Sequence, residues 1–198
     1  MSMKQMVFKR FERFWHWSQA LLIILMMLTG FEIHGVYTLF GFYTAVLYHE
    51  YLAYTLMTLW VFAIFWHFTT GEWKQYIPTF QQFPEVLRYY AFGIFRGEKH
   101  PYKATPERKH NPLQRFAYLG FHLVMGPLVW VTGLLKLLYS DWEALGLGWL
   151  ELSWVAYFHL VGAYLLVVFL IAHVYMATTG ATPLAYIKAM ITGYDEHN

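Results

Sequence analysis

The chain has 198 residues, of which 58% are hydrophobic, 21% are aromatic and only 13% are charged. Proteins average about 25% charged residues, so this composition excludes an ordinary soluble domain and indicates one integral membrane domain over residues 1–198. The net charge of +2 gives no indication of a nucleic-acid partner. The chain has no cysteine, which excludes disulfides, cysteine-ligated iron–sulfur clusters and covalently attached haem, so any haem is held non-covalently.

Four segments are long and apolar enough to cross a ~30 Å hydrocarbon core as helices. They run approximately over residues 14–33, 42–68, 116–139 and 154–180. Gly126-Pro127 in the third segment predicts a kink of the kind that neighbouring helices tolerate. No small-residue cleavage site follows the first segment, so we expect a retained helix and not a removed signal peptide. The sequence therefore predicts an all-α membrane protein with a bundle of four transmembrane helices.

The lysines and arginines predict how the chain crosses the membrane. All of them except Lys136 lie before the first segment, in the connection between the second and third segments, or after the fourth. Because loops rich in lysine and arginine stay on the cytoplasmic side, both termini and that connection are predicted to be cytoplasmic.

The connection between the second and third segments, residues 71–115, is too long for a simple turn. Within it, residues 84–95 begin with a proline, which suits the first turn of a helix. They mix bulky apolar side chains with Glu85 and Arg88, so we expect an interfacial helix along the inner membrane surface. An ordered cytoplasmic loop agrees equally well with the same pattern.

Two histidines in the fourth segment have a spacing that suits haem ligands. His159 and His173 are 14 residues apart, about 40° short of four full helical turns, so the two imidazoles share one face about 21 Å apart along the axis. A histidine within the membrane is costly and usually functional, and imidazole is a standard axial ligand of haem iron. The spacing favours two haem b groups stacked across the membrane, one near each surface.

Two further histidines lie at matching depths in other segments. His49 lies about seven residues from the outer end of the second segment, at the depth of His159. His16 lies near the inner end of the first segment, where it can face His173. We therefore predict that His49 and His159 ligate an outer haem iron and that His16 and His173 ligate an inner one.

His67 and His122 are alternatives. His67 lies 18 residues from His49, a rise of about 27 Å, so ligation by both pairs would need a helix shift of about 6 Å. At the inner boundary a solvated histidine is also ordinary. His122 could replace His16 opposite His173, line a quinone pocket, or hydrogen-bond a neighbouring backbone carbonyl. The remaining histidines fall in loops or tails and are expected to be solvated: His34, His100, His110 and His197.

Two arginines and two Thr-Gly pairs accompany these histidines. Arg10 and Arg13 precede His16 on roughly the same helix face, so they are candidates to pair with the propionates of the inner haem. Anchoring on the cytoplasmic side explains these arginines equally well. Thr29-Gly30 and Thr132-Gly133 lie near the outer ends of their segments, where glycine admits either a flat macrocycle or a tightly packed helix.

These features resemble the bacterial di-haem cytochrome b subunits that anchor respiratory oxidoreductases. That superfamily includes the gamma subunit of membrane-bound formate dehydrogenase, the cytochrome b of thiosulfate reductases and the b-type subunit of nickel–iron hydrogenases. The matching stretches cover the whole membrane portion and are RFERFWHWSQALLIILMMLTG, LYHEYL, HNPLQRF and AHVYMATTG. The formate dehydrogenase type is the most similar, because it has the same 14-residue separation of the two histidines.

The resemblance implies a four-helix bundle in the bacterial inner membrane with the four histidine ligands named above, and it favours His16 over His122. It also implies a menaquinone or ubiquinone site near His173, and the matching positions there are Asn111 and Gln114. From the residue pattern alone, those two are helix-capping or loop residues. The implied partners are a periplasmic iron–sulfur or multihaem c subunit and a catalytic subunit. The chain ends at GYDEHN, without the extended charged tail of some formate dehydrogenase subunits.

The sequence as a whole therefore predicts an electron conduit between an outer-face redox partner and quinone at the inner face, in either direction. It would be one subunit of a larger oxidoreductase and not a catalyst on its own. If quinone exchanges protons, Glu107, His110 or water could carry them. A proton-coupled transporter and a haem-free membrane anchor are the alternatives, although neither explains why histidines share helix faces and depths.

Overall fold

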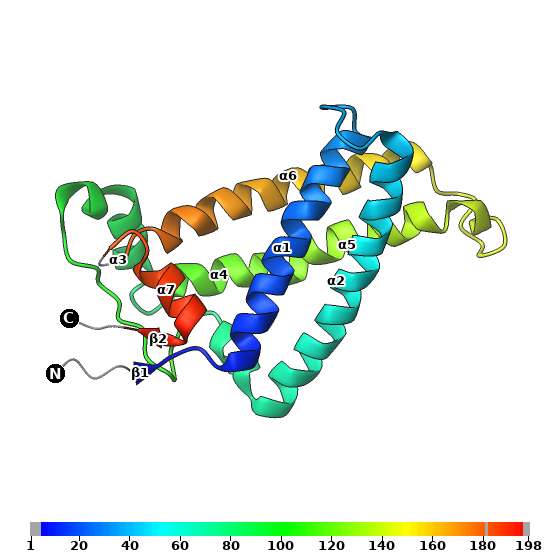
Figure 1. Ribbon diagram of the computed structural model, residues 1–198. Helices are drawn as coiled ribbons and strands as arrows, with labels where there is room; N and C mark the ends of the chain where they lie inside the picture. Colours follow the sequence, from blue (N-terminus) through cyan, green and yellow to red (C-terminus); the bar gives the residue numbers. More distant parts are fainter. Residues whose placement is uncertain (1–4, 181, 196–198) are drawn as a thin grey trace. The chain divides into compact units, whose positions relative to one another are not determined.

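The structure is a computed structural model that describes residues 5–180 and 182–195 and is mostly helical (Figure 1). It contains four helices long and apolar enough to cross a membrane: Arg10–Ile33, Phe42–Thr70, Pro112–Leu137 and Leu152–Ala177. Most of their side chains are not buried within the protein, and many of the exposed ones are large and apolar. Such a surface suits lipid and not water, so the predicted all-α membrane class is confirmed.

The chain divides into two compact units, Met1–Lys74 with Ile187–Asn198, and Gln75–Tyr186. Each contains one helical hairpin. In the first unit, helix α1 (Arg10–Ile33) packs against α2 (Phe42–Thr70). The carboxylate of Glu32 holds the connection between them, because its Oε1 accepts hydrogen bonds of 2.7 Å from the backbone N–H groups of residues 39–41. These N–H groups precede the first turn of α2 and need acceptors.

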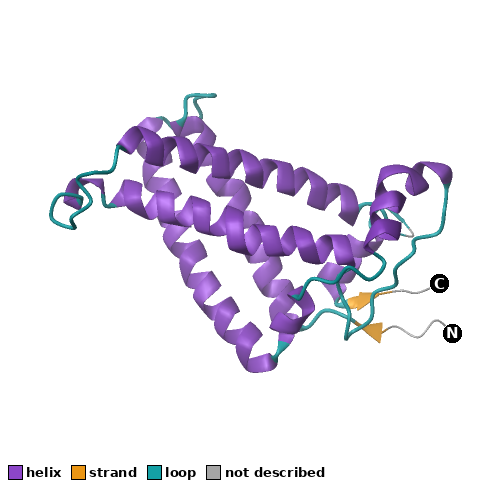
Figure 2. Ribbon diagram, turned by 180° about the vertical axis from the view of Figure 1, so that it is seen from behind, coloured by secondary structure: helices purple, strands orange, loops and turns teal. Residues whose placement is uncertain are grey.

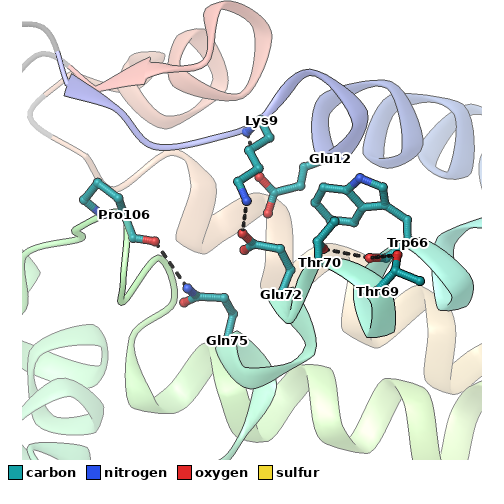
Figure 3. Close-up of polar contacts among 8 residues, drawn as sticks. All are labelled: Lys9, Glu12, Trp66, Thr69, Thr70, Glu72, Gln75 and Pro106. Atoms are coloured by element: carbon teal, nitrogen blue, oxygen red, sulfur yellow. Dashed lines mark hydrogen bonds and ion pairs between the residues drawn. The ribbon is translucent and has the colours of Figure 1, made fainter.

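The other end of the first hairpin is held by charged and polar contacts (Figure 3). Glu12 accepts a hydrogen bond of 2.7 Å from the backbone N–H of Lys9 at the start of α1. The Lys9 ammonium pairs at 2.5 Å with Glu72, in the short 3₁₀ helix η1 (Glu72–Tyr76) that follows α2. The start of α1 is thereby tied to the end of α2.

Two short strands, β1 (Gln5–Met6) and β2 (Tyr194–Asp195), pair antiparallel beside the first hairpin (Figure 2). Helix α7 (Ala185–Thr192) leads into β2, and its last turn accepts hydrogen bonds from Arg13 and Trp17 of α1. Residues near the start and the end of the chain therefore lie together, and the cytoplasmic location of both termini stays a prediction.

In the second unit, the connection predicted to hold a helix forms α3 (Phe83–Arg88), a π-helical turn η2 (Tyr89–Gly93) and a 3₁₀ turn η3 (Ile94–Arg96). Val86, Tyr89 and Tyr90 from this segment form a buried cluster with Met176 of helix α6 (Leu152–Ala177). The helix is confirmed. Its position along the membrane surface stays a prediction.

The third membrane segment is interrupted where the sequence predicts a kink. It consists of α4 (Pro112–Gly120), a π-helical turn η4 (Phe121–Met125) and α5 (Gly126–Leu137). Pro127 cannot donate a backbone hydrogen bond and its ring excludes the carbonyl one turn earlier, so the π turn absorbs the mismatch directly before it. A 3₁₀ turn, η5 (Tyr139–Asp141), follows α5 on the way to α6.

Gly162 allows α5 and α6 to pack closely. A Cβ atom at this position would lie 2.5 Å from Cγ1 of Val129, well inside van der Waals contact. This glycine therefore allows tight helix packing in the second hairpin. The sequence leaves open whether such a glycine admits a packed helix or a flat macrocycle.

Candidate functional site

His49 is held by α1, the neighbouring helix of its own hairpin. Its Nδ1 lies 3.0 Å from Oγ1 of Thr29, and the threonine is 3% exposed. The same hydroxyl lies 3.0 Å from the carbonyl oxygen of Leu25, one turn earlier in α1. The threonine therefore bridges the backbone of α1 and the imidazole ring of α2.

Gly30 provides the space for this ring. A Cβ atom on Gly30 would lie 3.2 Å from Cε1 of His49 and 3.6 Å from Nδ1. The first of these contacts is tight enough that the ring would have to move. Gly30 thus admits the histidine ring itself.

His159 has the same environment in the second hairpin. Its Nδ1 lies 3.0 Å from Oγ1 of Thr132 on α5, and that hydroxyl also hydrogen-bonds the carbonyl of Leu128. A Cβ atom on Gly133 would lie 3.3 Å from Cε1 of His159 and 3.7 Å from Nδ1. Each hairpin therefore carries a Thr-Gly pair on its first helix and a histidine against that pair on its second.

The sequence pattern marks the two Thr-Gly pairs but indicates no role for the threonines. The available signal was the repetition of this dipeptide near the outer ends of the first and third segments, at the depth of His49 and His159. From the sequence, the glycines suit either a macrocycle or close helix packing. The structure shows that they lie against the histidine rings.

His16 and His173 have aromatic surroundings. The ring of His16 lies edge-on to Trp17 of α1, with the centroids 5.1 Å apart. The ring of His173 stacks on Phe169 of α6 at 5.9 Å and 12°, and it lies 6.2 Å from the ring of Tyr118. Each predicted ligand pair combines a histidine of the first unit with a histidine of the second unit, so the pairing stays a prediction.

His67 and His122 bond to their own helices. In each case Nδ1 lies 2.7 Å from the carbonyl oxygen four residues earlier, that of Ala63 or Tyr118. His67 is buried, with the ring of Trp15 at 5.0 Å. The contact of His122 is the predicted hydrogen bond to a backbone carbonyl, and His67 makes the same contact while buried and not solvated.

His100 is not the solvated loop residue that the sequence suggests. Its Nε2 lies 3.0 Å from the hydroxyl of Tyr90, and its Nδ1 lies 2.7 Å from the carbonyl of Tyr102. Burial lowers the pKa of this imidazole, which keeps it neutral near pH 7. The connection folds back on itself in three dimensions, which the residue pattern does not reveal. His197 lies outside the described residues.

Asn111 and Gln114 form a reciprocal cap at the start of α4. Asn111 Oδ1 accepts from the backbone N–H of Gln114 at 2.8 Å, and Gln114 Oε1 accepts from that of Asn111 at 2.9 Å. Asn111 is buried and also donates to the hydroxyl of Tyr90 at 3.2 Å. The capping role read from the residue pattern is thus confirmed, whereas their predicted contact with quinone stays a prediction.

The two candidate propionate partners differ in their contacts. Arg13 donates from Nη1 to the carbonyl of Ile191 at 2.6 Å, and its guanidinium lies beside Gly193. Arg10 is exposed at the first turn of α1. Arg13 therefore ties α1 to α7, and the propionate role of both arginines stays a prediction.

Comparison with known proteins identifies the family. The model of the family described as prokaryotic cytochrome b561 matches residues 7–193. This chain belongs to that family. It is 34% identical to "Putative cytochrome YdhU" of Escherichia coli (strain K12) over 191 residues, 93% of this chain and 72% of that protein.

This cytochrome is also 28% identical to the "Probable Ni/Fe-hydrogenase B-type cytochrome subunit" of Cupriavidus necator over 214 residues, 92% of this chain and 83% of that protein. No solved structure matches it. The predicted superfamily is confirmed. The protein is a bacterial membrane cytochrome of the b561 type, which binds haem b and transfers electrons.

The residues of the cytochrome fit such a group. Among the residues that the structure describes, no three His, Cys, Asp or Glu side chains gather to hold a bare metal ion. A haem needs only one or two protein ligands, because the macrocycle supplies the rest. His49 and His159 suit this role, since a second hydrogen-bonding partner orients the ring of a metal-ligating histidine.

Proposed function

We propose that this cytochrome is a di-haem b subunit that transfers electrons between a periplasmic redox partner and quinone near the cytoplasmic face of the bacterial inner membrane. The observation that carries the proposal is the same threonine–histidine contact in both hairpins. One such contact is an ordinary way to satisfy a buried histidine. Two with matching geometry, in a b-type cytochrome, favour a symmetric pair of iron ligands.

In this proposal, His49 and His159 ligate an outer haem iron, and His16 and His173 ligate an inner one. When bound, each haem b supplies an iron that accepts and releases one electron. The two hairpins then form one domain over residues 1–198, with both pairs of histidines turned toward its interior. The long apolar helices around them exclude water, and the basic side chains of Arg10 and Arg13 approach the propionates.

The proposed quinone, menaquinone or ubiquinone, lies beside the inner haem near His173. The side-chain oxygens of Asn111 and Gln114 are engaged in the cap of α4. The NH₂ group of Gln114, and the second N–H of the Asn111 amide whose first N–H donates to Tyr90, are therefore the donors that we propose for a hydrogen bond to a quinone carbonyl. This contact would hold the quinone head group in place.

A pocket near the start of α4 is the route that we propose for the protons that quinone exchanges. It has a volume of about 110 Å³ and is lined by His110, Arg108 and Arg115 among others. Such a volume accommodates a few water molecules at about 30 Å³ each. Of the candidates predicted from sequence, His110 with water is thus favoured over Glu107 as the proton carrier.

The relatives support the proposed partners, and the charge distribution supports the proposed orientation. The C. necator relative is named as a hydrogenase subunit, which supports a role within a larger oxidoreductase. We propose an iron–sulfur or multihaem c subunit and a catalytic subunit on the periplasmic side. The lysines and arginines near the termini and in the connection of residues 71–115 favour the cytoplasmic side for the termini and for that connection.

Haem quantitation tests this function. The purified protein should give two haem b per chain by pyridine haemochrome and a b-type reduced-minus-oxidised spectrum. His49→Ala should retain one haem, whereas a change at the exposed loop residue, His34→Ala, should retain both. A wild-type ratio of one or zero would contradict the proposal, as would a folded His49→Ala protein that keeps two haems or loses both.

A further inference from the structure

We infer that Thr29 and Thr132 are positioning residues that fix His49 and His159 in the tautomer with the proton on Nδ1 and the lone pair on Nε2. The inference rests on the proposed function, because it assigns the two rings to iron ligation through Nε2. It adds that the hydroxyls of Thr29 and Thr132 select the tautomer and hold the rings. Both of these groups lie on the neighbouring helix of the same hairpin.

The hydroxyl proton of Thr29 determines the direction of the hydrogen bonds. A hydroxyl has one proton to donate and two lone pairs to accept with. Oγ1 lies 3.0 Å from the carbonyl oxygen of Leu25, which can only accept, so the proton is directed to that oxygen. The contact of 3.0 Å with His49 must then be a donation from Nδ1–H to Oγ1. The lone pair of the neutral imidazole consequently lies on Nε2.

The opposite assignment is unfavourable. If Thr29 donated to Nδ1, its oxygen and that of Leu25 would face each other at hydrogen-bond distance without a proton between them. Nε2 of His49 would then carry the proton and could not ligate a metal. Because Thr29 is buried, water cannot relieve that repulsion.

Thr132 repeats the arrangement in the second hairpin. Its hydroxyl donates to the carbonyl of Leu128 and accepts from Nδ1–H of His159 at 3.0 Å. Thr132 is 7% exposed, so its hydrogen bonds are also protected from water. Two independent hairpins thus reach the same tautomer by the same means.

Position distinguishes this hydrogen bond from those of His67 and His122. Those two histidines contact a carbonyl of their own helix, so the acceptor for Nδ1 does not come from the neighbouring helix. His49 and His159 instead contact a side chain across the hairpin, so helix packing sets the direction of Nε2. A hydrogen bond accepted from Nδ1–H also makes the imidazole a stronger donor to iron, which stabilises Fe(III) over Fe(II).

The experiment replaces each hydroxyl with a methyl group and then restores it. Thr29→Val and Thr132→Val keep the side-chain shape and remove the hydroxyl, whereas Thr29→Ser and Thr132→Ser retain it. Two readouts are measured on the purified holoprotein: the midpoint potential of each haem, and the transfer of haem to excess apomyoglobin. Thr55→Val is the matched control, because Thr55 is exposed and its hydroxyl bonds to the carbonyl of Tyr51 in the same helix.

Each valine variant should raise the midpoint potential of one haem and weaken its retention about 10–100-fold, as loss of a hydrogen bond behind a metal ligand typically does. The serine variants should resemble the wild type, as should Thr55→Val. Valine variants that match the wild type in both readouts would overturn the inference. Equal defects in the valine and serine variants would also overturn it, because they would indicate a requirement for shape.

His49→Ala separates this inference from the proposed function. If that variant loses one haem while the Thr29 variants behave as the wild type does, His49 is a ligand and only the role of Thr29 is wrong. If the folded variant keeps two haems, the proposed ligation is itself wrong. Thr132 gives a second, independent test should Thr29→Val fail to fold.

Discussion

The two predicted pairs of ligands are held in different ways. His49 and His159 each contact a buried threonine hydroxyl and a glycine on the neighbouring helix of their hairpin. The contacts around His16 and His173 include the aromatic rings of Trp17 and Phe169. A hydrogen bond specifies both the tautomer and the direction of a ring, whereas an aromatic neighbour restricts only its plane. The threonine contacts therefore fix the tautomer and direction of the two outer rings, and the aromatic contacts orient the planes of the two inner rings.

Of the variants that test this comparison, those that enlarge Gly30 or Gly133 should have the largest effect on haem binding. In Gly30→Val or Gly133→Val, the new Cβ would lie 3.2 or 3.3 Å from Cε1 of the histidine, and the two added methyl groups would displace the ring. We expect each variant to lose one haem by pyridine haemochrome quantitation while the other haem remains.

Gly120→Ala is the control for these variants, because a Cβ atom at Gly120 meets no atom within 4 Å apart from its chain neighbours and the backbone of its own helix. It should retain both haems. A Gly30→Val protein with two haems and wild-type potentials would show that the ring is not confined as the structure indicates.

Gly162→Ala should affect stability and leave the histidine rings in place. Its Cβ would lie 2.5 Å from Cγ1 of Val129, and overpacking of this kind costs about 1–3 kcal/mol. The thermal unfolding midpoint should fall while the haem content stays at the wild-type value. Adding Val129→Ala should recover part of the loss. No recovery would indicate that the clash does not involve Val129.

Phe169→Leu should affect only the inner pair. The ring of Phe169 stacks on that of His173 at 5.9 Å, and such contacts contribute about 0.5–1.5 kcal/mol beyond burial. In a redox titration, the midpoint of one haem should shift, and it should not be the haem that responds to Thr132→Val. If Phe169→Leu and Thr132→Val shifted the midpoint potential of the same haem, the distinction between the inner and outer histidine pairs would be wrong.

The smallest expected effect concerns pH and lies outside the membrane segments. Burial lowers the pKa of His100 below its ordinary value of 6.5, so above that pH the group is neutral in both states and adds no pH dependence to the stability. As pH falls through 6.5 the unfolded chain binds the proton first, and stability should decrease. The unfolding midpoint should therefore fall less between pH 7.5 and pH 5.5 in His100→Gln than in the wild type. Equal pH dependence in the two proteins would contradict this assignment.

The helices could be predicted because the bilayer leaves few alternatives. A long apolar segment must satisfy its backbone hydrogen bonds internally, so the predicted end of the first segment at residue 33 and start of the second at residue 42 agree with the structure. The break near Gly126-Pro127 was predictable for the same reason, since proline cannot continue the hydrogen-bond ladder. The π-helical form of that break was not, because it depends on how the rest of the helix packs.

Candidate ligands could be predicted from spacing, but their surroundings could not. The 14-residue separation of His159 and His173 fixes a shared helix face. The contact of Thr132 with His159 depends on how α5 and α6 are rotated and shifted against each other, which no single-helix pattern contains. His100 illustrates the same limit, because its partner Tyr90 comes close only when the connection folds back.

The most direct test of the account is an experimentally determined structure of the purified, haem-loaded protein. We predict one haem whose iron is bonded to Nε2 of both His49 and His159, with Nδ1 of each ring donating to Thr29 or Thr132. A haem ligated by other residues, or rings of His49 and His159 that point at protein or lipid without iron between them, would contradict it.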